Sequence, residues 1–145
     1  MLALLQRVSH ASVVIEDITT ASINKGILVL CGFQPHDNLQ SLDKMLEKCL
    51  NYRIFSDNDG KMNLSVKAIE GELLFVPQFT LAANTNSGLR PSFSSAAIPQ
   101  HGQELFDELK RLALGKYPAC SFGQFGANMQ VSLCNDGPVT FWLSN

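Results

Sequence analysis

A short, uninterrupted apolar run near residue 30 constrains the fold more than any other stretch of the chain. Ile27–Cys31 contains no polar residue, and Gly26 and Gly32 bound it. A short run between glycines is typical of a strand that is buried on both faces. Such a strand needs a covering layer on each side of its sheet. We therefore expect a layered α/β fold around this strand.

Two amphipathic helices are predicted. The first has apolar residues at helical spacing, and Asp37 with Gln40 resembles a capping box at its start. Its buried face would consist of Leu42, Met45, Leu46, Cys49 and Leu50. The second runs from about Gln100 to Leu114, and Gly115 would end it. Two helices are too few to cover both faces of the sheet, so the sequence predicts a three-layer α/β/β fold with mixed sheets.

The other apolar segments are predicted to be strands. Ser9 and His10 would separate the first two, and Ser56–Gly60 would form a turn. The predicted strands are Leu2–Val8, Ala11–Glu16, Arg53–Phe55, Leu73–Val76, Phe122–Ala127, Met129–Leu133 and Val139–Leu143. The polar stretch Ala82–Ser95, around Arg90, is expected to be a functional loop because long loops in a compact domain often are.

Length and composition place the chain among cytoplasmic globular proteins. Its 145 residues fit a single domain, 1–145, and 46% of them are hydrophobic against 17% charged. No apolar run approaches the roughly 20 residues of a membrane span, and the N-terminus does not resemble a signal peptide. Four cysteines, far apart in sequence, are typical of reduced thiols. A net charge of −2 argues against broad binding to nucleic-acid backbones but leaves recognition of one nucleotide end open.

The stretch Val76–Leu81 is the first candidate functional site. Pro77 has no N–H group, so it marks a strand edge, a strand start or a bulge. Gln78 and Thr80 alternate with apolar residues and would lie on one face of a strand. Taken alone, this pattern is that of an ordinary strand edge.

The second candidate is Asn135–Thr140, in which Gly137 and Pro138 interrupt the last apolar run. A Gly–Pro bond can be cis at low cost, and glycine reaches backbone angles closed to other residues. Taken alone, the pattern is that of a turn. Sequence motifs of nucleophilic hydrolases, nucleotide-binding loops and zinc proteases are absent, and no general base stands out. If the chain is an enzyme, main-chain N–H groups would have to stabilise the developing charge.

These two stretches resemble the signatures of one family. Pro77–Leu81 resembles the Ser-Gln-Phe-Thr-Leu signature of the D-aminoacyl-tRNA deacylases, and Asn135–Thr140 matches their Asn-x-Gly-Pro-Val-Thr signature. Other similar segments, in the family's order, are Gln6–Ser9, Asn51–Phe55, Gly60–Asn63, Gly71–Leu74, Gly88–Phe93 and Phe125–Ala127. The resemblance implies a cytoplasmic homodimer that needs no metal, cofactor or membrane. It would hydrolyse the ester between a D-amino acid, or glycine mischarged on tRNA-Ala, and the 3′ end of tRNA.

The resemblance also implies roles for individual residues. Gly137 and Pro138, joined by a cis bond, would project from one subunit into the partner's site, and Arg7 would buttress their loop. The loop would hold the substrate's α-amino group with main-chain carbonyls and leave no room for an L side chain. N–H groups near the scissile ester would polarise its carbonyl, and a water positioned with help from the substrate's ribose hydroxyl would attack. The residues lining the ester would be Gln78, Phe79 and Thr80.

Four positions depart from the family's pattern. Pro77 stands where the family usually has Ser, Phe122 where it has Thr, and Asn128 where it has Asp. The last two lead toward Met129, which the resemblance places at one wall of the substrate pocket. Gly102 stands where Ala is usual and would still leave room for the terminal adenosine.

Two alternatives remain open. Pro77 leaves room for a non-catalytic dimeric module that binds nucleic acid on the same fold. A hydrolase of small D-amino acid esters, with no need for tRNA, is the other.

Overall fold

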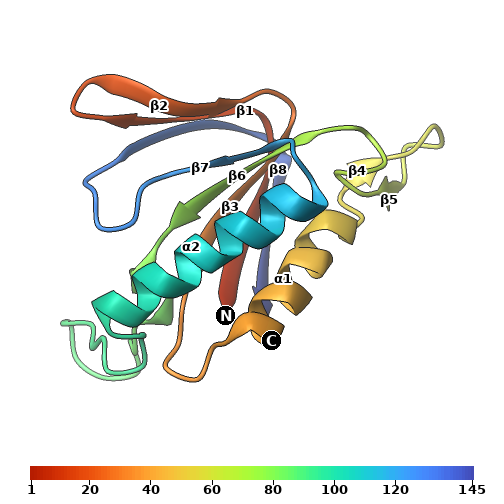
Figure 1. The fold of residues 1–145 in the computed structure, drawn as a ribbon. Helices are drawn as coiled ribbons and strands as arrows, with labels where there is room; N and C mark the ends of the chain where they lie inside the picture. The colour runs from red at the N-terminus through yellow and green to blue at the C-terminus, as the bar shows by residue number, and fades with distance from the viewer.

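Strand β3 (Gly26–Gly32) lies at the centre of the sheet, as its uninterrupted apolar sequence predicts. The computed structural model describes residues 1–145. Figure 1 shows β3 between β1 (Leu2–Ile15), which is antiparallel to it, and β6 (Glu72–Pro77), which is parallel to it. The sheet is completed by β2 (Ile18–Ile23), β7 (Cys120–Phe122) and β8 (Gln130–Ser144). The predicted mixed α/β fold with two main helices is confirmed.

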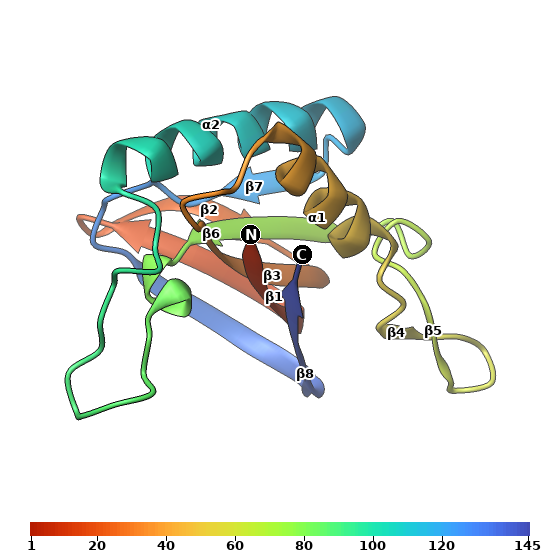
Figure 2. The ribbon, with the colours of Figure 1, turned by 90° about the horizontal axis from the view of Figure 1, so that it is seen from below.

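The helices α1 (Leu39–Asn51) and α2 (Pro99–Lys116) lie on the same side of the sheet (Figure 2). The buried face of α1 consists of the predicted residues Leu42, Met45, Leu46, Cys49 and Leu50. These residues pack with Phe106 of α2 and Val29 of β3 into the larger hydrophobic core. Burial raises the pKa of the Cys49 thiol to about 12, so this cysteine remains a protonated core residue.

The opposite face of the sheet encloses a second, smaller core because β1 bends. Ala3 and Leu5 face the helices, whereas Ala11 and Val13 pack into the second core with Leu28 of β3. The inward positions change from one face to the other at Ser9–His10, where the pairing of β1 with β8 shifts register. A bulge changes strand direction in this way. The curled sheet thereby supplies both β layers.

The prediction of two separate strands, Leu2–Val8 and Ala11–Glu16, was therefore wrong. Residues Leu2–Ile15 form one bulged strand, and the following strand β2, which is largely exposed, was missed. The change in the apolar pattern at Ser9–His10 looks like a break between two strands. Strand β1 nevertheless pairs with β8 on both sides of this bulge.

Both helix boundaries differ by one or two residues from the prediction. The N-cap of α1 is Asn38, whose side chain accepts hydrogen bonds from the N–H groups of Gln40 and Ser41. Asp37, the predicted cap, is buried instead and accepts a hydrogen bond from the Gln34 N–H (2.8 Å). Helix α2 continues through Gly115 to Lys116, whose ammonium group is 2.7 Å from a carboxylate oxygen of Glu47 in α1.

A small hairpin of β4 (Phe55–Ser56) and β5 (Met62–Leu64) extends away from the sheet (Figure 2). The strand predicted at Arg53–Phe55 begins later, and the predicted turn joins the two strands with Gly60 at a φ of +76°. Neither helix of the protein is long and apolar enough to cross a membrane.

Candidate functional site

The candidate stretch Val76–Leu81 leaves the sheet immediately after Pro77. Gln78 donates its N–H to the carbonyl of Cys31 (2.7 Å), and the chain then forms the 3₁₀ turn η1 (Phe79–Ala82). The expectation that this stretch continues as a strand was wrong. The turn packs against Gly32, where an added Cβ would lie 3.0 Å from the Gln78 carbonyl oxygen. Long-range contact with a glycine, not local pattern, therefore decides this backbone path.

The turn places main-chain donors and polar side chains at an exposed corner. The N–H groups of Phe79 and Thr80 lie at its start, where a helical turn supplies no acceptor of its own. The N–H of Leu81 donates to the Gln78 carbonyl (3.2 Å). The Gln78 amide donates to the Thr80 hydroxyl, so these two side chains are together although they do not share a strand.

An apolar groove with a volume of about 420 Å³ begins beside this corner. We call it the aromatic groove; its lining residues are Pro77, Phe79, Phe93, Ala96, Ala97, Ile98, Pro99, Phe125 and Gly126. The rings of Phe79 and Phe93 are 5.0 Å apart and partly exposed. None of the lining side chains is ionisable, so polar recognition here falls to main-chain groups.

Gly102 and Met129 support the walls of the aromatic groove from behind. A Cβ on Gly102 would lie 2.9 Å from Cζ of Phe125, so the ring occupies the space that a larger residue would need. The sulfur of Met129 accepts the Gln124 N–H (3.4 Å) and fills the space over Gly123, next to Pro77. Neither residue lines the groove directly.

The second candidate stretch is a wide bulge inside β8. Val8 pairs with Asn135 and Gln6 with Thr140, so Arg7 alone faces residues 136–139, which we call the 136–139 loop. Strand β8 is continuous on both sides of this loop, so the two strands predicted at Met129–Leu133 and Val139–Leu143 are parts of one element. The strand predicted at Phe122–Ala127 was wrong, because strand β7 ends at Phe122 and residues 123–127 lie outside any strand.

The Gly137–Pro138 bond in the 136–139 loop is cis, as predicted, and both residues are exposed. Arg7 crosses beneath them. Its Nε donates to the Asp136 carbonyl (2.9 Å), and its Nη1 donates to the Ile54 carbonyl (2.7 Å). The Arg7 side chain is only 13% exposed, so the loop rests on a nearly buried cation.

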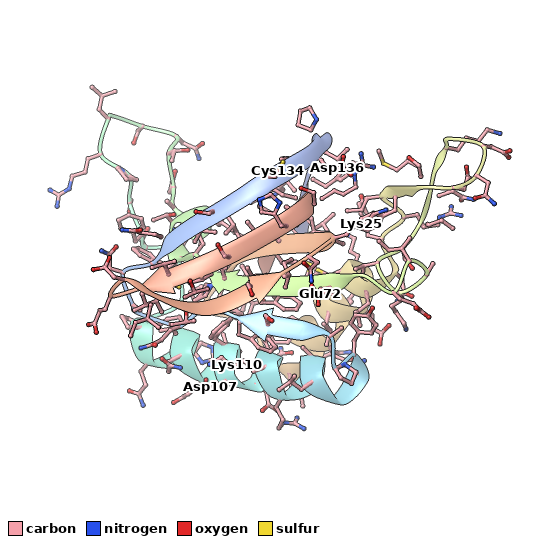
Figure 3. The ribbon with its side chains drawn as sticks, turned by 90° about the horizontal axis from the view of Figure 1, so that it is seen from above. Lys25, Glu72, Asp107, Lys110, Cys134 and Asp136 are labelled. Carbon is pink, nitrogen blue, oxygen red and sulfur yellow. The ribbon has the colours of Figure 1, made fainter.

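Within one chain, the aromatic groove and the 136–139 loop lie at opposite ends of β3. Arg7 pairs with Ile27 at one end, whereas Pro77 pairs with Cys31 near the other. Four residues of strand separate these positions by roughly 13 Å along the sheet. Figure 3 shows Asp136 well away from the green turn that follows β6. One chain therefore brings Gln78, Phe79 and Thr80 together but does not add Gly137 and Pro138 to them.

The sequence analysis missed part of the groove. It placed a functional loop at Ala82–Ser95 around Arg90, but the residue of that loop that lines the groove is Phe93. Phe93 and Phe125 are aromatic residues within polar, glycine-containing stretches. That contrast was the available signal, since an aromatic side chain outside a strand or helix often lines a site.

Comparison with known proteins agrees with this architecture. A family model described as D-Tyr-tRNA(Tyr) deacylase matches residues 4–144. The D-aminoacyl-tRNA deacylase of Legionella pneumophila (strain Lens) is 59% identical over 143 residues, covering 99% of both chains.

Two solved structures are similar over nearly their whole length. One, described as a c-Myc DNA unwinding element binding protein, has a TM-score of 0.95 at 36% identity and covers 100% of this chain and 99% of its own. The other, a probable eukaryotic D-amino acid tRNA deacylase, has a TM-score of 0.87 at 15% identity, covers 98% of this chain and 97% of its own, and shows the fold alone. Because the family model and the Legionella relative both span almost the entire chain, this protein belongs to the D-Tyr-tRNA(Tyr) deacylase family of ester hydrolases.

Proposed function

We propose that this protein hydrolyses the ester between a D-amino acid and the 3′ end of tRNA in the cytoplasm, without a metal or cofactor. Glycine mischarged on tRNA-Ala would be a second substrate. The observation that carries the proposal is the aromatic groove, whose lining includes Phe79, the first residue of η1. Membership of the family and relatives named D-aminoacyl-tRNA deacylase support it.

The terminal adenosine of tRNA fits the chemistry of the aromatic groove. The 3′ end of tRNA is single-stranded, and unstacked bases bind well on aromatic side chains. Phe79 and Phe93 offer partly exposed rings, and Phe125 forms part of the wall. An adenosine in the groove would present its aminoacyl ester to η1.

Hydrolysis at this position relies on main-chain groups. The N–H groups of Phe79 and Thr80 donate to the ester carbonyl oxygen and stabilise the negative charge that develops there. Water, positioned with the help of the ribose hydroxyl, attacks the carbonyl carbon. The bond between that carbon and the ribose oxygen breaks, the ribose oxygen receives a proton, and the products are the free amino acid and tRNA.

Selection of the D form is assigned to the 136–139 loop of a second copy of the chain. The loop of one chain lies at the far end of β3 from its own groove, so only another copy can bring Gly137 and Pro138 to Thr80. The sheet face not covered by helices supports such a dimer. Leu4 pairs there with Leu30 and with Trp142, whose side chain is half exposed. Exclusion of the L side chain by the loop rejects the wrong enantiomer through a steric clash.

The decisive test compares two charged tRNAs. We expect purified protein to release D-tyrosine from D-Tyr-tRNA and to leave L-Tyr-tRNA intact over the same time, because only the D side chain avoids the loop. Loss of radiolabelled amino acid from acid-precipitated tRNA measures both rates. Equal rates on the two enantiomers would refute the proposal. Rapid hydrolysis of a free D-tyrosine ester, with no preference for the tRNA form, would favour a small-ester hydrolase.

The substitution Thr80→Ala is expected to change kcat for D-Tyr-tRNA by less than about threefold, because the proposed stabilisation comes from main-chain N–H groups that the variant retains. Single-turnover kinetics would measure this. A loss of two orders of magnitude, restored in Thr80→Ser, would instead assign the reaction to the hydroxyl group that Gln78 contacts.

A nucleic-acid-binding module is the second candidate, and one observation favours it. The solved structure with 36% identity is described as a DNA unwinding element binding protein. This candidate predicts retention of DNA or uncharged tRNA without ester turnover. Fluorescence anisotropy with labelled oligonucleotides, measured beside the deacylation assay, separates the two.

A further inference from the structure

The two ends of the 136–139 loop are joined by their own side chains. Asn135 and Thr140 are the residues at which β8 leaves and resumes its pairing with β1. The Asn135 amide nitrogen donates to the Thr140 hydroxyl (2.9 Å), and its Oδ1 accepts the Val139 N–H (2.8 Å). A single amide group therefore closes the loop at its base.

These contacts act on parts of the loop that Arg7 does not reach. Arg7 holds the first residue of the loop through the Asp136 carbonyl, whereas Asn135 holds the last through the Val139 N–H. Gly137 lies between them, and a Cβ placed on it would come within 2.7 Å of Val139 and 3.1 Å of Arg7, so both residues crowd this position. The hydrogen bond from the Val139 N–H is partly buried, which limits competition from water, whereas the bond to Thr140 is exposed.

We propose that Asn135 is a positioning residue that sets the D-to-L selectivity of the reaction. The inference rests on the proposed function, in which the 136–139 loop excludes the L side chain. Without the Asn135 hydrogen bonds, Val139 and Thr140 move relative to Arg7. Gly137 and Pro138, at the tip of the loop, then no longer occupy one fixed position. A tip that moves away from the groove of the second copy leaves room for the L side chain. The same movement also weakens its contact with the D substrate.

Three variants test this proposal against a matched control. Asn135→Leu removes both hydrogen bonds, and Thr140→Val removes one while keeping the shape of the side chain. Asn135→Asp retains both, because its carboxylate accepts the Val139 N–H and the Thr140 hydroxyl can donate to it. Ser132→Ala, at another exposed position of β8, is the control.

We expect the ratio of kcat/KM for D-Tyr-tRNA to that for L-Tyr-tRNA to fall about tenfold in Asn135→Leu and about threefold in Thr140→Val. The ratio stays near the wild-type value in Asn135→Asp and Ser132→Ala. The rate on L-Tyr-tRNA rises in Asn135→Leu, which general loss of folded protein would not produce. Thermal melting of each variant identifies the folded fraction, and Thr140→Val remains informative if Asn135→Leu fails to fold.

Two outcomes would overturn the inference while the proposed function stands. In the first, the wild type is selective and folded Asn135→Leu has the same D-to-L ratio of kcat/KM as the wild type. If Asn135→Leu does not fold, an unchanged ratio in Thr140→Val counts in the same way. The other is equal loss of selectivity in Asn135→Asp and Asn135→Leu. A wild type that shows no preference for D-Tyr-tRNA would instead refute the proposed function itself.

Discussion

Gly137→Ala is expected to lower kcat/KM for D-Tyr-tRNA roughly 100-fold, because a strained backbone angle and a steric clash act together. Gly137 has a φ of +140°, a region that L residues rarely adopt. An added Cβ would lie 2.7 Å from Cγ2 of Val139 and 3.1 Å from Nη2 of Arg7. Relief of these contacts requires the 136–139 loop to move, so its carbonyls would no longer hold the substrate's α-amino group in the way the family resemblance implies.

Gly60→Ala is the matched control for this change. Gly60 also has a positive φ (+76°), but nothing lies within 4 Å of a Cβ placed there. The control therefore introduces backbone strain of about 1–3 kcal/mol without a clash. We expect it to lower the thermal midpoint and leave kcat/KM nearly unchanged. If Gly137→Ala deacylates D-Tyr-tRNA as fast as Gly60→Ala, the loop has no part in holding the substrate.

Gly102→Phe is expected to raise KM for D-Tyr-tRNA by two orders of magnitude or more, because it removes space from the aromatic groove. Even a methyl group at this position would lie 2.9 Å from the ring of Phe125. A phenyl group forces Phe125 into the volume proposed for the terminal adenosine. Gly102→Ala requires only a small ring shift, and we expect a reduction of about threefold to tenfold.

The same helix supplies the control. Gly115→Ala adds a methyl group near the end of α2, where nothing lies within 4 Å, and alanine is the better helix former. We expect unchanged kinetics and equal or greater stability. Isothermal titration with adenosine monophosphate would show whether Gly102→Phe blocks the groove. Unimpaired nucleotide binding and turnover in Gly102→Phe would place the adenosine elsewhere.

A heterodimer of the two impaired variants, Gly137→Ala and Gly102→Phe, tests whether a second copy of the chain contributes to each site. In a heterodimer of Gly137→Ala and Gly102→Phe chains, one site carries both changes and the other carries neither. Two different affinity tags allow its purification. We expect about half of the wild-type activity, since a two-fold dimer has two equivalent sites. A heterodimer as inactive as both homodimers would show that each loop serves its own chain or that the loop and groove do not cooperate.

The local sequence pattern was sufficient to predict a strand or helix where the burial of that element follows from its own residues. The apolar run Ile27–Cys31 predicted the central strand, and the spacing of Leu42–Leu50 predicted the buried face of α1. The two motif stretches identified the regions of η1 and the 136–139 loop, and the cis bond that the family resemblance implied is found at Gly137–Pro138. These features depend on residues close together in sequence.

Tertiary structure alone decided the path of the backbone at both motif stretches. The turn after Pro77 forms against Gly32, and the bulge in β8 forms around Arg7, which also binds the carbonyl of Ile54. The aromatic groove joins Phe93 and Phe125, which are brought together only when α2 packs on the sheet. The sequence by itself identified the two candidate stretches, because their residue types and order are local. Their placement depended on the fold, because the contacts with Gly32 and with Arg7 join residues distant along the chain.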